Sequence, residues 1–399
     1  MAGNERDSLG ELRLAFRCKL VVESGAHDRH FCPVTAYIPV SYKNCSNLEV
    51  VDSKSKRRVP CQVSKKRHGV TLSWLVTNWK AGTKQTLLAK NRAAHAAAPR
   101  VRVDNRNDEA RVDISVHGKP FTTYHYGRER VRPFLHPLIG PKGARVTRNW
   151  PGDRTTKGEH RDHRHHKSIW VDYGACGKVD HWSEDPGHGW QRHQQFLNLS
   201  WGPVFGAIRA RNAWCYPNGR KQFEELRELR VYALRGGTRL FDLDVTFKMT
   251  QGPVTFKDTK EVGLVSIRAG RAMELRHGGR IENAYGGVNE RETWGKPAPW
   301  CDYSGMADGV HVGLAVLDHE SNPRYPTAWQ VRDYGLMTAN CFAESHYRPA
   351  LGLKGDMRFR KGQQRTWRYR LYIHPGDARQ GRVSQRFLDY VSPPAVTVT

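Results

Sequence analysis

The histidines of this chain gather in one stretch. Of its 19 histidines, nine lie within residues 125–193, and the densest part holds His163, His165 and His166. These three follow a Pro/Gly-rich loop and precede an apolar run, so they lie where a loop enters a strand. In an extended segment His163 and His165 project to one face and His166 to the other. Imidazole, with a pKa of about 6.5, exchanges protons near neutral pH and is also a common transition-metal ligand.

Three interpretations of this cluster stay open. In one, His165 or His166 transfers protons or hydrogen-bonds sugar hydroxyls beside the aromatic platforms Trp170 and Trp182. In another, His163 and His165 join a carboxylate from elsewhere in a two-His-one-carboxylate site, which implies a divalent metal ion as cofactor. The third is a solvated basic loop. The spacing contains no H-E-x-x-H zinc signature.

Residues 254–264 place an acid, a base and an acid close together as Asp258, Lys260 and Glu261. Opposite charges this close keep a partly buried carboxylate ionised, which suits a general base or an electrostatic anchor. In a regular strand Glu261 faces away from Asp258 and Lys260, so only one of the two sets can face a cleft. An exposed strand end with ordinary surface pairing is the alternative.

A further polar group follows the apolar run at residues 312–317. It comprises residues 318–324 and 329–335, and polar groups at the end of a buried strand are typical of sites built on a rigid scaffold. The Asn-Pro and Tyr-Gly pairs within it are equally typical of turns.

The elements that must position these residues are predicted to be β-strands. Apolar and polar residues alternate over residues 241–247 and 366–371, as half-buried strands require. The 37 glycines and 21 prolines interrupt such runs at short intervals, which favours antiparallel structure. Residues 383–391 show a helical period and precede two prolines. The chain is therefore predicted to be mostly β, with a short C-terminal helix.

The chain is predicted to form two domains. A break near residues 91–99 follows about seven short strands, the size and rhythm of a small β-sandwich. We therefore expect a small N-terminal β-sandwich over residues 1–95. A larger antiparallel β-sandwich, with the histidine cluster and the C-terminal helix, is expected over residues 96–399.

Composition excludes several classes of protein. Of 399 residues, 38% are hydrophobic, which is too many for a disordered chain, and no apolar run reaches the length of about 18 residues that a membrane helix needs. The polar start predicts a cytoplasmic protein. The eight cysteines include no C-x-x-C pair and are interpreted as free thiols.

The charge is strongly basic. With 65 Lys and Arg against 39 Asp and Glu, the formal net charge is +26. The basic residues are spread along the whole chain without a helix-turn-helix, RNP or zinc-finger pattern. We therefore do not expect nucleic acid to be the main partner, and keep non-catalytic polyanion or polysaccharide binding as an alternative.

An ordered series of motifs resembles the DUF6807 family, which is often labelled methane oxygenase PmoA-like. The motifs are residues 132–138, 162–170, 179–182, 258–261, 302–305, 318–323 and 331–335, and the resemblance covers about residues 10 to 375. The second motif departs from the family pattern at Arg164, where proline is usual, and at Ser168, where glycine is usual. An insertion-like segment precedes it at residues 154–159.

What the resemblance implies is mainly architecture. The family is similar to galactose-mutarotase-like super-sandwiches, whose members bind sugars in a concave sheet and use histidine with glutamate or aspartate. The oxygenase label derives from a membrane-spanning subunit, which this chain does not resemble in hydropathy. The mutarotase comparison is an analogy at the level of the fold.

We therefore expect a carbohydrate-processing enzyme, with epimerase, mutarotase, lyase or hydrolase chemistry on a saccharide or a sugar-derived small molecule. Proton transfer is assigned to His165 or His166 against Glu261, with Asp333 in the same cleft. The residues expected to contact substrate are Arg132, His136, Trp170, Trp182, Lys260, His319, Asn322, Arg332 and Tyr334. A metal-dependent enzyme with His163 and His165 as ligands is the alternative. All of this depends on the convergence of the three polar groups in one cleft.

Overall fold

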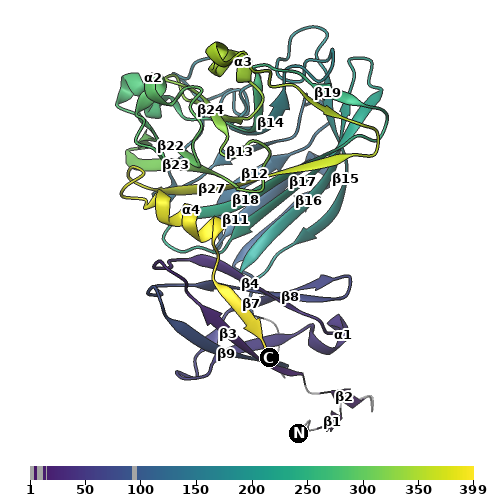
Figure 1. Cartoon of the computed structure of the whole chain (residues 1–399), viewed down its shortest axis with the longest axis vertical. Helices are drawn as coiled ribbons and strands as arrows, with labels where there is room; N and C mark the ends of the chain where they lie inside the picture. Colours follow the sequence, from purple (N-terminus) through teal and green to yellow (C-terminus); the bar gives the residue numbers. More distant parts are fainter. Residues whose placement is uncertain (1–3, 7–11, 15, 92–96) are drawn as a thin grey trace. The chain divides into compact units, whose positions relative to one another are not determined.

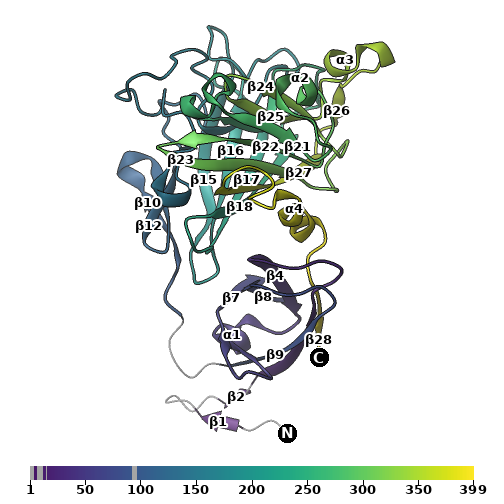
Figure 2. The ribbon, with the colours of Figure 1, turned by 90° about the vertical axis from the view of Figure 1, so that its left-hand side faces the viewer.

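The structure is a computed structural model of the chain. It describes residues 4–6, 12–14, 16–91 and 97–399 (Figures 1 and 2). Its contacts divide the chain into two compact units. The first unit comprises Met1–Val101, Trp201–Phe205 and Leu388–Thr399, and the second comprises Arg102–Ser200 and Gly206–Phe387.

These units differ from the predicted domains in more than one segment. The predicted boundary falls in residues 92–96, which lie outside the described residues. Residues 96–399 were all assigned to the large domain, but the first unit extends to Val101 and also includes Trp201–Phe205 and Leu388–Thr399. For the last of these segments the physical reason is strand pairing: β28 (Ala395–Val398) hydrogen-bonds antiparallel to β3 (Arg17–Glu23).

Two eight-stranded sheets form the second unit. The strand order in the first large sheet is β10 (Val101–Arg106), β11 (Arg111–Val116), β12 (Lys119–His125), β13 (Phe134–Leu138), β14 (Ile169–Tyr173), β20 (Val262–Arg268), β25 (Leu336–Asn340) and β24 (Ala328–Arg332). The order in the second large sheet is β15 (Trp190–Ser200), β16 (Phe205–Cys215), β17 (Lys221–Tyr232), β18 (Arg239–Lys248), β27 (Gln364–Pro375), β23 (Val310–Asp318), β22 (Trp300–Ala307) and β21 (Arg280–Asn283). Figure 1 shows the long strands β15 to β18 lying side by side with β27.

The first large sheet has one apolar and one polar face, because side chains alternate along each strand. The paired positions on the apolar face are Tyr124, Leu135, Ile169, Ile267, Met337 and Val331, in strand order from β12 to β24. The paired positions on the opposite face are His125, Phe134, Trp170, Ser266, Thr338 and Gln330. Strands β14, β20 and β25 are buried on both faces, so the polar face is covered as well.

The other elements are short. They are the strand pair β19 (Val254–Phe256) and β26 (Met357–Phe359), the helices α2 (Asn289–Thr293), α3 (Glu344–Tyr347) and α4 (Val383–Val391), and the 3₁₀ turns η1 (Asn107–Glu109), η2 (Pro141–Gly143), η3 (Arg271–Met273), η4 (Leu275–His277) and η5 (Pro349–Leu351). Strand accounts for 49% and helix for 10%, which confirms a mostly β protein. The predicted C-terminal helix is confirmed as α4. Within the described residues no helix has the length and apolar character to cross a membrane.

The first unit consists of small sheets and one helical turn, α1 (Tyr42–Cys45). The five-stranded sheet has the order β28, β3, β9 (Lys84–Asn91), β5 (Leu48–Asp52) and β6 (Arg58–Val59), and the three-stranded sheet has the order β4 (Cys32–Ile38), β8 (Gly69–Val76) and β7 (Cys61–Lys66). A separate pair is formed by β1 (Asn4–Arg6) and β2 (Leu12–Leu14). Residues of both larger sheets, among them Leu20, Val50 and Trp74, share one apolar core.

A buried arginine ties residues near the C-terminus into this unit. Arg29 is 2% exposed, and its Nη1 lies 3.2 Å from Asp389 Oδ1. The same nitrogen donates to the main-chain oxygen of Ser392 at 2.6 Å, and Nε donates to that of Ser24 at 2.7 Å. Buried charges are tolerated when they are paired and hydrogen-bonded in this way.

We expect Arg29→Met to lower the free energy of unfolding of the first unit by about 3–5 kcal/mol, because it removes the guanidinium that neutralises the buried Asp389 carboxylate. Urea denaturation measures the change. The matched control is Arg57→Met, at an exposed arginine of the same unit. An effect at Arg29 no larger than the effect at Arg57 would contradict a structural role for this pair.

Candidate functional site

The polar face of the first large sheet carries an aromatic cluster of its own. Phe134, Trp170, Trp182 and Leu336 pack together there, with Tyr334 against them. They come from β13, β14, β25 and the loops beside these strands. The histidine loop before β14 lies over this aromatic cluster, which we therefore take as the floor of the candidate site.

Arg148 gives the histidine loop its shape. Its buried guanidinium donates from Nη2 to the main-chain oxygens of His163 and His166, at 2.9 and 3.0 Å. Its Nη1 donates to Asp162 Oδ1 at 2.6 Å and to the Asp162 main-chain oxygen at 3.0 Å. The loop is therefore wrapped around a cation, and its carbonyl groups are satisfied although they lie in a buried region.

Arg268 determines which nitrogen of His166 carries the proton. It is fully buried at the end of β20, and its Nη1 lies 3.0 Å from His166 Nδ1. Its Nη2 lies 3.3 Å from Asp162 Oδ1, and its Cζ lies 4.5 Å from the centroid of the Tyr334 ring. A guanidinium only donates, so His166 Nδ1 must accept, and the neutral ring then carries its proton on Nε2.

His166 is held neutral with a free donor. The side chain is 1% exposed, and burial together with the charges of His165 and Arg268 holds its pKa well below the usual range. The ring lies over Trp170, with 5.2 Å between centroids and 21° between planes. Its Nε2 is buried and has no hydrogen-bond partner among the residues that the structure describes. An N–H donor inside the fold is thus left without an acceptor, as are other buried side-chain atoms among the described residues, including His136 Nε2.

His165 lies beside His166 in a similar environment. Burial, followed by the charge of Arg132, lowers the pKa of His165 to about 3. Its ring centroid is 4.4 Å from that of His166 and 5.6 Å from that of Trp182. Within the described part of the chain, His165 Nε2 also lacks a partner.

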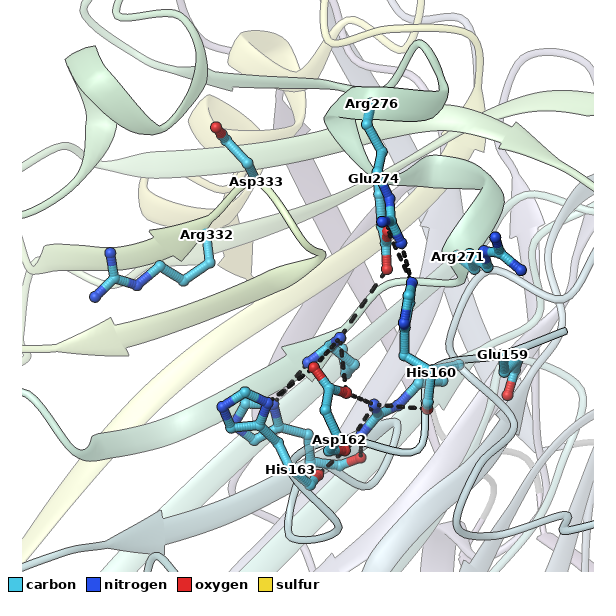
Figure 3. A network of polar contacts seen from close by, with 12 residues as sticks. Glu159, His160, Asp162, His163, Arg271, Glu274, Arg276, Arg332 and Asp333 are labelled. Atoms are coloured by element: carbon cyan, nitrogen blue, oxygen red, sulfur yellow. Dashed lines mark hydrogen bonds and ion pairs between the residues drawn. The ribbon is translucent and has the colours of Figure 1, made fainter.

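His163 is the exposed member of the cluster and is oriented by Asp162. Its Nδ1 lies 2.9 Å from Asp162 Oδ2, and its side chain is 43% exposed. A carboxylate accepts, so Nδ1 carries the proton and, in the neutral ring, Nε2 presents a lone pair. The ring stacks on His166 at 4.8 Å and 4°, and on Tyr334 at 5.4 Å and 10°. Figure 3 shows Asp162 and His163 together in one polar network.

Asp162 stays ionised in this network. Burial raises the pKa of its carboxyl, but the hydrogen bond from His163 and the charges of Arg268 and Arg148 outweigh burial and hold that pKa well below its usual range. One carboxylate therefore serves two arginines and orients one imidazole.

Two residues of the loop have left-handed backbone conformations. They are His163, with φ 42°, and Ser168, with φ 60°. Glycine adopts such a conformation without steric cost, whereas other residues are strained in it. Here Ser168 is buried, and its Oγ lies 2.7 Å from Thr147 Oγ1. This hydrogen bond holds the serine where the loop enters β14.

Arg132 supports the aromatic floor from below. Its Nη1 donates to Asp172 Oδ2 at 3.0 Å, and its Nη2 donates to the main-chain oxygen of Trp182 at 2.8 Å. Asp172 also accepts hydrogen bonds from Trp170 Nε1 and, at 3.2 Å, from Ser266 Oγ. Both side chains are fully buried. Arg132, which was predicted to contact substrate, therefore has Asp172 as a structural partner.

Glu261 lies on the same face, close to Trp182. A Cβ placed on Gly174 would be 2.9 Å from Glu261 Cβ and 3.6 Å from Trp182 Cβ, so both side chains leave the backbone beside this glycine. Burial raises the pKa of Glu261, whereas the charges of Lys260, Arg332 and, more weakly, His163 lower it. Lys260 Nζ lies 3.9 Å from Glu261 Oε1. Glu261 and His163 are thus within electrostatic reach of one another.

Asp333 and Arg332 do not join the histidines. Arg332 Nη1 lies 2.6 Å from Glu290 Oε1, and Asp333 Oδ1 accepts from the main-chain N–H of Glu290 at 3.3 Å. In Figure 3 the ends of both side chains point away from Asp162 and His163. The next residue, Tyr334, does face the cluster, because side chains of successive residues point in different directions.

His136, His319 and Asn322 also have local structural partners. Burial lowers the pKa of His136 to about 4, and its ring packs against Gly152. His319 Nδ1 accepts from Ser321 Oγ at 2.9 Å. Asn322 is buried, and its side chain donates to Asp318 Oδ1 and to the Arg368 main-chain oxygen, both at 2.7 Å. The hydrogen bonds of His319 and Asn322 are those of a turn after β23, in the second large sheet.

The described part of the chain contains no metal-ion site of the usual kind. Nowhere in it do three or more His, Cys, Asp or Glu side chains lie in an arrangement that could hold a metal ion. Of the two predicted ligands, His163 is engaged with Asp162, and His165 packs edge-on against His163 with 5.7 Å between centroids. A divalent metal ion stays a prediction of the sequence alone.

Four charged residues of the site were not predicted from the sequence: Arg148, Asp162, Asp172 and Arg268. One feature of the sequence could have pointed to Arg268: it is a charged residue at the end of a strand whose other residues are nearly all apolar. Lone buried charges are too costly to persist unless they are paired, so such a residue implies partners elsewhere in the chain. The spacing of the motifs does not say which partners these are.

The model of a family described as "Family of unknown function (DUF6807)" matches residues 111–387. No curated protein matches the chain.

The buried histidines make a prediction about stability and pH. Burial lowers the pKa values of His165 and His181 to about 3. In the unfolded chain these rings bind a proton near pH ~6.5. Between these values the unfolded state binds more protons, so stability must fall as the pH falls.

We expect His181→Gln to reduce the slope of the unfolding free energy against pH, between pH ~4 and ~6, by about 1.4 kcal/mol per pH unit. Urea denaturation at a series of pH values measures the slope. The same substitution at the exposed His311 is the control. An unchanged slope in the His181 variant would show that this imidazole is not held neutral.

Proposed function

The chain belongs to the DUF6807 family, and we propose that it is a carbohydrate-processing enzyme that performs acid/base chemistry above the polar face of its first large sheet. The observation that carries the proposal is the unpartnered Nε2–H of His166, buried beside an aromatic floor. A donor fixed in this way suits a substrate oxygen, because a sugar hydroxyl, ring or carbonyl oxygen supplies the missing acceptor.

In this proposal His166 stabilises negative charge on a substrate oxygen. A neutral imidazole held by Arg268 donates without first having to reorient, which is the property that makes a preorganised donor effective. Burial keeps the ring neutral, and the hydrogen bond from Arg268 keeps it aligned before any substrate binds. Arg268 is a positioning residue, because it acts through His166 Nδ1.

Two groups are available to move protons. His163 is oriented by Asp162 through Nδ1 and has a partly exposed side chain, so in the neutral ring Nε2 carries the lone pair. An imidazole held by a carboxylate is the usual construction of a general base. Glu261 is the second group, and burial raises the pKa of its carboxyl, which favours the protonated form. Epimerisation, ring opening and β-elimination each need one group that takes a proton and another that returns one.

The aromatic side chains support a saccharide as the substrate. Tyr334 is half-buried and packs beside His163, and aromatic side chains commonly line small-molecule sites. Trp182 lies buried beneath this cluster and packs against His165. Asp333, predicted to be catalytic, has no role in this proposal because its contacts are with Glu290. The predicted substrate residues His319 and Asn322 are likewise left out.

We expect His166→Ala to lower kcat on the true substrate by about 100-fold or more, because it removes the donor. His166→Gln, which keeps an amide N–H, should recover part of that loss. Turnover of a panel of saccharides followed by NMR is the measurement, and circular dichroism reports whether each variant is folded. His319→Ala, outside the proposed site, is the control. Full turnover in folded His166→Ala protein would exclude the proposed role.

For Glu261 we expect a pH-dependent signature. If its ionised form takes the proton, kcat/KM rises with pH through its pKa, which burial places above the value of about 4.3 of a free glutamate. Glu261→Gln should remove this limb of the pH–rate profile and lower the plateau. Asp258→Asn, which changes a neighbouring carboxylate, is the control. If Glu261→Gln keeps the acidic limb of the pH–rate profile, another titrating group must cause that limb.

A further inference from the structure

A second feature lies beside the histidine loop: a pocket of about 470 Å³ with a strongly basic lining. Its five cationic side chains are Arg130, Arg154, Arg161, Arg164 and Lys167. Two carboxylates, Glu129 and Glu184, line it as well. Most of these residues come from the loop before β14, the same loop that carries the histidines.

The two carboxylates do not neutralise the pocket. Arg130 Nε donates to Glu129 Oε1 at 2.9 Å, and Lys167 Nζ lies 2.6 Å from Glu184 Oε1. Each carboxylate is therefore engaged by one cation. Arg164 donates to the main-chain oxygen of Glu184, so its charge has no carboxylate partner there.

Arg154 and Arg161 carry charges that nothing balances. Both are exposed, and neither has a hydrogen bond or ion pair with any residue that the structure describes. Exposed arginines are ordinary on a surface, but here they line one pocket with three further cations. Clefts lined by charge of one sign concentrate ligands of the opposite sign.

The pocket also has an aromatic wall. Phe134 belongs to it, with Lys167 Nζ 5.6 Å and Arg130 Cζ 5.8 Å from the centroid of its ring. Phe134 is at the same time part of the aromatic floor of the histidine site. Trp150 lines the pocket too, with Arg148 5.0 Å from its ring centroid.

The pocket and the histidine site are built by neighbouring residues. Lys167 follows His166 directly, and the charge of Lys167 is one of those that lower the pKa of His165. Arg148 contacts Trp150 on the pocket side and Asp162 on the histidine side. A ligand that spans both would place one group on the histidines and another among the arginines.

We infer that this pocket binds the anionic substituent of an acidic saccharide, a carboxylate or a sulfate ester, and so selects charged sugars over neutral ones. The guanidinium groups match the planar, bidentate geometry of carboxylates and also bind sulfate. The aromatic wall suits a sugar ring more than an isolated inorganic ion. That the ligand is a saccharide rests on the proposed function, whereas the preference for negative charge rests on the pocket alone.

The test is direct binding of a galacturonate oligosaccharide, with its methyl ester as the uncharged form of the same sugar. Isothermal titration calorimetry on the full chain at low ionic strength should give at least about tenfold tighter binding of the free acid. Arg154→Gln/Arg161→Gln should lose about tenfold or more in affinity for the acid and leave the ester unchanged. Arg235→Gln/Arg365→Gln, which removes two exposed arginines outside the pocket, should bind as the wild type does.

Several outcomes would overturn the inference. These are equal affinity for acid and ester, no binding of either, or the same loss in both double variants, which would indicate bulk charge alone. A sulfated galactose oligosaccharide distinguishes the two anionic groups, and binding of either acidic sugar that depends on Arg154 and Arg161 supports the inference. Duplex DNA bound more tightly than any sugar, through the same two arginines, would reassign the pocket to nucleic acid.

Binding and chemistry fail in different ways. Affinity for the acidic sugar is measured apart from turnover, because the proposed general base His163 does not line the pocket. Wild-type protein that binds the acidic sugar through Arg154 and Arg161, and turns over no saccharide, would refute the proposed enzyme and leave the pocket intact. Turnover of an acidic sugar with an unchanged KM in the Arg154→Gln/Arg161→Gln variant would refute the pocket and leave the enzyme intact.

Discussion

The arrangement of the candidate site depends on two buried arginines that share one carboxylate. Arg148 and Arg268 are both buried, and both contact Asp162. Buried cations require hydrogen-bond acceptors, and the histidine loop supplies them as main-chain oxygens and as His166 Nδ1. One requirement of charge burial therefore determines the path of the loop, the tautomer of His166 and the ionisation of Asp162. Asp162 in turn orients His163.

The same constraint explains why the three histidines of the loop have different electrostatic surroundings. His165 and His166 lie among arginines, and repulsion adds to burial in keeping both rings unprotonated. His163 is exposed and lies against a carboxylate, so its surroundings are electrostatically different. Nearby histidines of a single loop thus have different chemical properties. The difference arises from how deeply each ring is buried and from the charges around it, since the residue type is the same.

The β character of the chain and its terminal helix were predictable because both depend on local periodicity. Alternation at residues 241–247 predicts β18, and the helical period at residues 383–391 predicts α4. The convergence of the histidine loop with Trp182, Tyr334 and Glu261 was predicted from residue types and depends on long-range strand order. Asp333 shows the limit of that reasoning. It is adjacent to Tyr334 in sequence, yet it contacts Glu290 instead of the histidines. The partners of Arg148 and Arg268 were not predictable, since pairing across 102 residues, as between Arg268 and His166, leaves no local pattern.

The pairing of β3 with β28 has a consequence for biosynthesis. Arg29 and Asp389 are 360 positions apart, and nearly all of the second unit lies between them in the chain. On a ribosome, the early strands of the first unit emerge long before the segment that borders β3. Until that segment arrives, one edge of β3 is open and can pair with another nascent chain. The five-stranded sheet of the first unit is therefore completed only when β28 has been synthesised.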